Sequence, residues 1–196
     1  MLKADIVKFE LSTAKIAAWA TAVLIATAPA HADIISFNPR ATYFRTAGSD
    51  SSFDAIPIDL ISRGFLAGQF VDLAAVGDFG FFPGSDGNIR SLPAVFSSSA
   101  TLLASSNLSR VVGAIDAGTD YFSGPSFSGS LPTDIPEDFL VPHITLGSAL
   151  TIQVPTGATH LFISVADSLF EDNVDPDGNL GISITVAAVP EPSSWA

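Results

Sequence analysis

The chain has 196 residues, with 20 Asp and Glu against 8 Lys and Arg, a formal net charge of −12 and no cysteine. So acidic a chain excludes nucleic acid as a partner and disfavours anionic lipid, because binding phosphate needs clustered Lys or Arg. The lack of cysteine excludes thiol catalysis, zinc held by thiolates and iron–sulfur clusters, and the length allows one domain with a proper core.

The first 32 residues have the order of a secretory signal peptide. Three lysines lie within residues 1–15, an uncharged apolar run covers residues 16–28, and Ala30-His31-Ala32 forms a small-x-small cleavage site. The run is shorter than the ~20 residues that span a bilayer. We therefore expect cleavage after Ala32, which leaves Asp33 as the new N-terminus. Cleavage would remove all three lysines and two acids, so that five arginines and 18 acids give a formal charge of −13.

The rest of the chain reads as β structure, since short runs rich in Val, Ile, Phe and Thr alternate with clusters of Gly, Pro, Ser and Asp. In Gly181–Ala188, apolar residues take every second position, a pattern that buries one face of a strand. We expect an all-β domain over residues 33–188, an antiparallel β-sandwich or jelly roll. The candidate strands are Gln69–Val76, Ala94–Leu103, Arg110–Ile115, Ala149–Val154, His160–Ala166 and Gly181–Ala188.

Three long loops separate these strands: residues 77–91, which hold four glycines and two acids, residues 116–142, and the acidic residues 167–180. Loops longer than ~12–15 residues in a compact domain are often functional. For the middle loop, decorated surface is the expected role.

The acidic loop contains Asn173-x-Asp175-x-Asp177-Gly178, the first half of a calcium-binding loop. Position twelve of an EF-hand would be Ile184 instead of a bidentate Glu, so an EF-hand is rejected. A calcium site of another kind stays open, with a solvated acidic turn as the alternative. So many carboxylates in one short loop repel each other without a cation, which favours calcium. The candidate ligands are Asp167, Asp172, Asn173, Asp175, Asp177 and Asn179.

Residues 154–186, with VPTGATHLFISVAD followed by DN and GISITV, resemble the C-terminal part of the small bacterial calcium-dependent galactose-binding lectins of the PA-I type. The resemblance implies a galactose-binding-like fold, calcium bound by Asp167, Asp172 and Asn173, and sugar hydroxyls bound by the calcium. It also implies a backbone carbonyl ligand near Ala74–Gly77. The chain departs from the family by having Asp for the first Asn of the pair and by the extra residues 174–178, and no counterpart of the galactose-selecting side chains is found.

The last residues, from Val189 to Ala196, contain Pro190-Glu191-Pro192 and resemble the start of a PEP-CTERM sorting tag. In that family the tag is processed by an exosortase, and it continues into a membrane helix and a basic cluster. Neither follows here, so residues 189–196 are interpreted as a truncated tag, with only a transient membrane contact through the missing helix. The resemblance implies an exported protein that ends on the cell surface or in the extracellular matrix.

No sequence motif nominates a catalytic centre. His143 is expected at the surface and His160 at the start of a strand, and Ser97-Ser98-Ser99 has no evident base. We therefore expect a protein without catalytic activity: an exported, calcium-stabilised β-sandwich that binds carbohydrate of the exopolysaccharide matrix. The alternatives are a structural surface or matrix protein that binds no sugar and a polysaccharide hydrolase, for which the acids to test are Asp134, Glu137 and Asp138.

Overall fold

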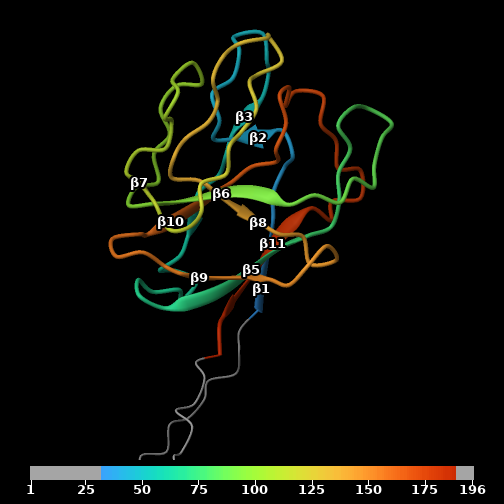
Figure 1. Cartoon of the computed structure of the whole chain (residues 1–196). Coiled ribbons are helices and arrows are strands. Elements are labelled where there is room, and N and C mark those ends of the chain that lie inside the picture. The colour runs from blue at the N-terminus through green and yellow to red at the C-terminus, as the bar shows by residue number, and fades with distance from the viewer. Residues whose placement is uncertain (1–31, 189–196) are drawn as a thin grey trace, which may run out of the picture.

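The computed structural model describes residues 32–188, which form eleven strands (Figure 1). Residues 1–31 of the predicted signal peptide, with Ala30, and the predicted sorting motif Pro190-Glu191-Pro192 lie outside the described residues, whereas Ala32 is the first residue of β1. The strands are β1 (Ala32–Ser36), β2 (Ala41–Thr42), β3 (Phe53–Asp54), β4 (Ile58–Asp59), β5 (Phe70–Val76), β6 (Leu92–Ser97), β7 (Ala114–Ile115), β8 (Phe139–Val141), β9 (Leu150–Gln153), β10 (His160–Ile163) and β11 (Gly181–Val186).

The strands build two antiparallel sheets, and the predicted all-β sandwich class is confirmed. One sheet has the order β1-β11-β5-β9, and the other has the order β4-β10-β6-β7. Strand β8 also pairs with β6, beyond the end of β7, and the short strands β2 and β3 form a separate parallel pair. The jelly-roll connectivity stays a prediction.

The core lies between the two sheets, because each contributes the apolar positions of its strands. In β11, Ile182 and Ile184 are buried while Ser183 and Thr185 are partly exposed, as the alternation predicts. Strand β6 is buried along its whole length, and its Phe96 stacks on Phe139 of β8 with ring centroids 5.3 Å apart. An aromatic pair of this kind adds about 0.5–1.5 kcal/mol beyond its buried area.

Several predicted strands are shorter in the structure. The run predicted as Ala94–Leu103 ends at Ser97, whose hydroxyl oxygen accepts a hydrogen bond from Ser99 N at 2.9 Å. Such a local side-chain bond offers the backbone an alternative to the ladder and turns the chain away. Of Arg110–Ile115 only the last two residues are a strand, and β8 lies within the segment predicted to be a loop. A three-residue strand is too short to show a period.

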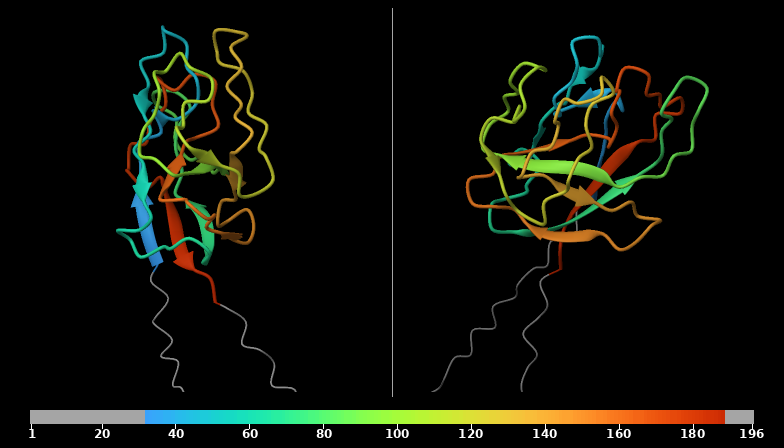
Figure 2. Two further views of the ribbon diagram at one scale, coloured as in Figure 1. Left: turned by 90° about the vertical axis from the view of Figure 1, so that its left-hand side faces the viewer. Right: turned by 45° about the horizontal axis from the view of Figure 1, so that its top comes forward.

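The long loops extend from one end of the sandwich, opposite the end where β1 begins and β11 stops (Figure 2). None of the residues that the structure describes forms a helix long and apolar enough to span a membrane.

Candidate metal centre

Two acidic loops start from neighbouring strands. Strand β5 leads into the loop of residues 77–91, and the loop of residues 167–180 leads into β11. Val76, at the end of β5, is the register partner of Gly181, at the start of β11. The sheet therefore fixes the first residues of one loop beside the last residues of the other.

Hydrogen bonds hold the two loops together along their length. Asp78 N donates to Asn179 Oδ1 at 2.6 Å, and Gly80 and Val174 exchange two backbone bonds of 2.8 and 2.9 Å. Gly77, with φ of +73°, lies so close to Asn179 that a Cβ atom there would be 2.1 Å from the Asn179 carbonyl oxygen. Only glycine fits this contact, which brings carboxylates far apart in sequence to one place.

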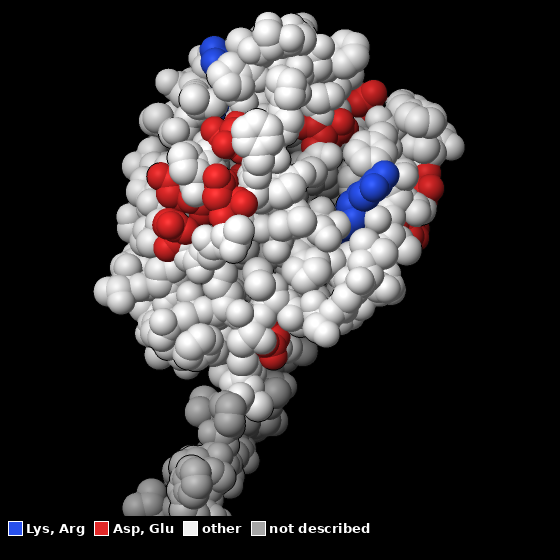
Figure 3. Space-filling view, viewed as in Figure 1, with Lys and Arg blue, Asp and Glu red and all other residues white. Residues whose placement is uncertain are grey.

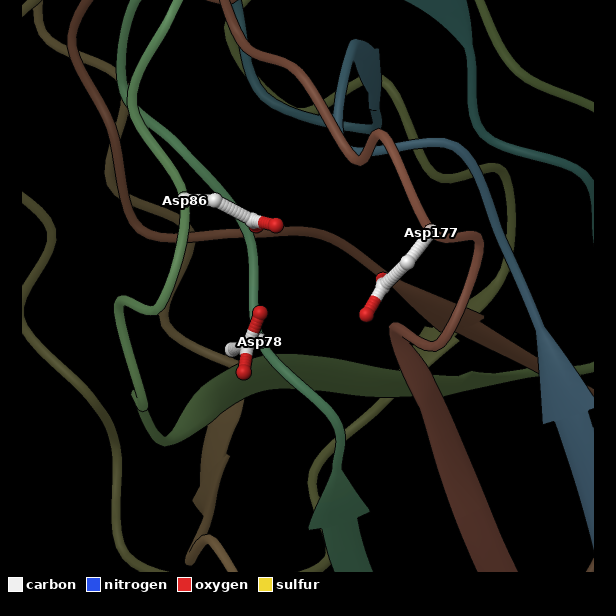
Figure 4. Close-up of side chains that lie close together, drawn as sticks. All are labelled: Asp78, Asp86 and Asp177. Carbon is white, nitrogen blue, oxygen red and sulfur yellow. The ribbon is translucent and has the colours of Figure 1, made fainter.

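Three carboxylates converge between these loops (Figure 4): those of Asp78, Asp86 and Asp177 each have an oxygen within 4.8 Å of the others. We name them the outer cluster. The pKa of the Asp86 carboxyl is raised, first by partial loss of water and then by its hydrogen bond to Asp78 and the charges of Asp78 and Asp177. Such repulsion is relieved by a bound proton or by a cation with oxygen preference, such as calcium.

Two further predicted ligands have other tasks beside this cluster. Asp175 caps the loop, because Oδ1 accepts from Gly178 N and Asn179 N and Oδ2 accepts from Leu180 N at 3.2 Å. Asn179 donates through Nδ2 to Asp177 Oδ2 at 2.7 Å while its Oδ1 holds Asp78 N. Asp175 therefore orders the backbone, and Asn179 orients the outer cluster.

Replacing Asp175 by alanine is expected to lower the free energy of unfolding by about 1–2 kcal/mol, because Gly178 N and Leu180 N lose their acceptor and Asn179 N keeps only its 3.3 Å bond to Asp177 Oδ1. Urea unfolding in a chelating buffer measures the change without any metal effect. The control is Asp116→Ala in another exposed loop, where the carboxylate accepts one bond, from Gly118 N. Equal stabilities of the two variants would contradict the capping role.

Asp167, Asp172 and Asn173 form a second group, which we name the inner group. Burial raises the pKa of the Asp167 carboxyl, and the charge of Asp172 adds to this, while hydrogen bonds from the Ser168 and Leu169 backbone and from the Asn173 side chain lower it. Asn173 is 2% exposed and donates through Nδ2 to Pro39 O at 3.2 Å. Its Oδ1 and the Oδ1 of Asp172 are buried without a hydrogen-bond partner.

The six predicted ligands thus divide by their contacts: three in the inner group, one in the outer cluster and two that order the loop. Asp78 and Asp86 were missed as ligands because they lie 99 and 91 residues before Asp177 in the sequence. Their signal was the glycine-rich loop of residues 77–91, which places an acid beside Gly77 and beside Gly87.

The expected surface position of His143 is wrong, since the residue is 3% exposed. Its Nε2 lies 2.8 Å from Gly77 O and therefore donates to this carbonyl, while Nδ1 accepts from Thr145 N at 3.2 Å. His143 thereby supports the turn from which the outer cluster starts. His160 opens β10, as expected.

A pocket of about 240 Å³ borders the inner group. Its lining joins the acidic loop to the middle loop and includes Phe44, Tyr121, Ser123, Asp167 and Ser168. An aromatic wall beside polar groups is an arrangement that suits a small polar ligand with an apolar face.

The space-filling view shows acidic groups outnumbering basic ones on this face of the molecule (Figure 3).

No family model, no curated protein and no solved structure matches the chain. The class that fold and site define is therefore an acidic, all-β, two-sheet protein with carboxylate-rich loops at one end.

Proposed function

We propose that the chain is an exported, calcium-stabilised β-sandwich that binds carbohydrate of the extracellular matrix. The observation that carries the calcium proposal is the buried Asn173 Oδ1, which has no hydrogen-bond partner and lies in the same loop as Asp167 and the unpartnered Asp172 Oδ1. Burying an amide oxygen without a partner costs about 1–3 kcal/mol, and a carboxylate oxygen costs more. Calcium, which takes six to eight oxygens at roughly 2.3–2.6 Å, is a cation that such unpartnered oxygens would bind.

The residues fit such an ion in two places. Asp167, Asp172 and Asn173 offer two carboxylates and one amide oxygen, the ligand types that calcium prefers. Asp78, Asp86 and Asp177 offer three carboxylates within 4.8 Å of one another. A bound ion would neutralise their repulsion and hold the two loops together.

The sugar part of the proposal is supported by the resemblance of residues 154–186 to calcium-dependent galactose-binding lectins. The pocket lined by Tyr121, Ser123, Asp167 and Ser168 lies beside the inner group. Its aromatic ring and hydroxyl groups are suited to the apolar face and the hydroxyls of a sugar ring.

Export is supported by the signal-peptide order of residues 1–32 and by the Pro190-Glu191-Pro192 motif. An exosortase is the proposed processing partner, and the cell surface or the surrounding matrix is the proposed destination. The high acidity is compatible with both, because it keeps the chain soluble and favours cations.

Of the two alternatives, the first is a matrix protein that binds calcium but no sugar. It differs from the leading proposal only because its pocket would bind no carbohydrate. The hydrolase has less support, because Asp138 is 1% exposed and its carboxyl does not reach a substrate. Asp134 is already engaged within its own loop, because its Oδ1 accepts hydrogen bonds from both Ser123 N and Ser123 Oγ.

Calcium titration by calorimetry and a glycan array test the proposal. We expect calcium binding that Asn173→Ala weakens at the inner group and that Asp86→Asn with Asp177→Asn weakens at the outer cluster. The matched control is Asn107→Ala, which removes an exposed asparagine from another loop. Glycan binding that disappears in chelator and in Asn173→Ala supports the lectin, whereas calcium binding without any glycan binding leaves the structural matrix protein.

A further inference from the structure

A buried carboxyl lies at the base of the middle loop, away from both calcium groups. Asp138 is 1% exposed and directly precedes β8. Its Oδ2 accepts a hydrogen bond of 3.2 Å from the hydroxyl of Tyr43, itself fully buried, and its Oδ1 is buried without a partner. One bond to a phenol is poor compensation for a buried charge, so this environment suits the neutral acid.

The charged groups that face Asp138 increase this preference. Asp134 and Asp120, from the two arms of the middle loop, are the charged groups that act most strongly on it, and both are acids. The Tyr43 hydroxyl and the Tyr121 backbone N–H lower the pKa and so oppose the effect of these charges. Strand β6, which pairs with β8, presents apolar residues at that point, namely Leu92, Pro93 and Ala94.

We propose that Asp138 acts as a proton-operated latch for residues 116–138, which we name the latch loop. While Asp138 is neutral, the loop stays packed against the sandwich. When Asp138 ionises, the loop is released. The arms of the loop are joined to each other, since Tyr121 N donates to Asp138 O at 3.2 Å and Ser123 N donates to Asp134 Oδ1 at 2.6 Å. Two bonds reach distant parts of the chain, from Tyr43 to Asp138 and from Phe127 N to Ser168 O. Opening the loop exposes the Asp138 carboxylate to water.

The direction of the pH effect follows from the protonation of the two states. Burial raises the pKa of Asp138 to about 7, the charges of Asp134 and Asp120 add to the rise, and the Tyr43 hydroxyl opposes it. In an open loop the carboxyl returns to an ordinary value near ~3.9. The closed state then binds the proton more tightly, so the latch is fully effective below about pH 4 and is lost as pH rises to about 7.

The latch loop also forms one wall of the pocket beside the inner group, through Tyr121, Ser123, Gly124 and Pro125. The lining also includes Ala166, Asp167 and Ser168, from the start of the acidic loop. Release of the loop therefore opens the pocket as the pH rises to about 7, and this does not depend on which ligand the pocket binds.

Limited chymotrypsin digestion of the chain in chelator, at pH 6 and pH 8.5, tests the latch because Tyr121, Phe122 and Phe127 are cleavage sites within the loop. The cleavage rate of the wild type is divided by the cleavage rate of Asp138→Asn at the same pH, because this division cancels the pH dependence of the protease itself. We expect this ratio to rise roughly tenfold between the two pH values, from the titration of Asp138 alone. An unchanged ratio would overturn the latch.

Two further variants complete the test. Glu137→Gln removes the neighbouring charge and is expected to keep the wild-type pH response. Tyr43→Phe removes the bond that favours the ionised form and so raises the pKa of Asp138 in the closed state further, so its pH response is expected to continue to higher pH than that of the wild type. If Asp138→Asn fails to fold, a Tyr43→Phe response that ends at the same pH as the wild-type response contradicts the proposal by itself.

Discussion

Replacing Arg110 by alanine is expected to lower the free energy of unfolding by about 3–5 kcal/mol. Arg110 is 1% exposed and donates to three backbone carbonyls, those of Thr42, Phe44 and Leu103, at 2.9–3.1 Å. It also pairs with Asp54, whose side chain is 71% exposed and stays hydrated after the change. The loss therefore comes from a cavity and from the lost donors to these carbonyls, of which Thr42 O keeps a bond from Ala55 N at 3.1 Å.

Urea unfolding in chelator measures this change, with Arg90→Ala as the control. Arg90 is exposed and lies over the Phe81 ring at 5.6 Å, a contact worth about 0.5–1 kcal/mol. Arg110→Lys keeps the charge but loses the planar set of donors, so we expect an intermediate value. Similar losses for the alanine variants of Arg110 and Arg90 would refute the structural role of the buried guanidinium.

Replacing Gly77 by alanine is expected to destabilise the chain by about 2–4 kcal/mol and to weaken cation binding at the outer cluster. The added Cβ would lie 2.1 Å from Asn179 O and 2.3 Å from Asn179 Oδ1, the atom that holds Asp78 N. Part of the loss comes from the positive φ of +73°, and the larger part from separating the two loops.

Gly84→Ala in the same loop isolates the backbone contribution, because Gly84 has φ of +83° but nothing within 4 Å of an added Cβ. We expect it to lose about 1 kcal/mol and to bind cations as the wild type does. A Gly77→Ala variant that behaves like Gly84→Ala would show that the close approach of the loops does not hold the cluster.

A clear two-residue period locates two of the strands from the sequence. The alternation of Ile182 and Ile184 with Ser183 and Thr185 located β11, and Leu150 and Ile152 located β9. Strands β2, β3 and β4 have two residues each, too few to carry a period. Their position depends on tertiary contacts such as those of Arg110, and an isolated arginine in a sequence does not reveal that it is buried.

The acidic loop was found from its composition, but its division into two groups was not predictable. Asp175 and Asp177 are two residues apart, and yet one caps the backbone and the other faces Asp78 and Asp86. Which carboxylate does which depends on the neighbouring loop, which is remote in sequence. The buried position of His143 depends in the same way on Gly77, 66 residues earlier.

The most direct test of the calcium-stabilised sandwich is a thermal melt of residues 33–188 in calcium and in chelator. A ligand that binds only the folded state stabilises it by about 2.7 kcal/mol at a hundred times its Kd, which corresponds to a rise in Tm of roughly 5–10 °C for a domain of this size. The account predicts such a rise, and predicts that Asp167→Ala with Asn173→Ala removes most of it. An unchanged Tm at millimolar calcium would contradict the account and leave the acidic loop as a solvated turn.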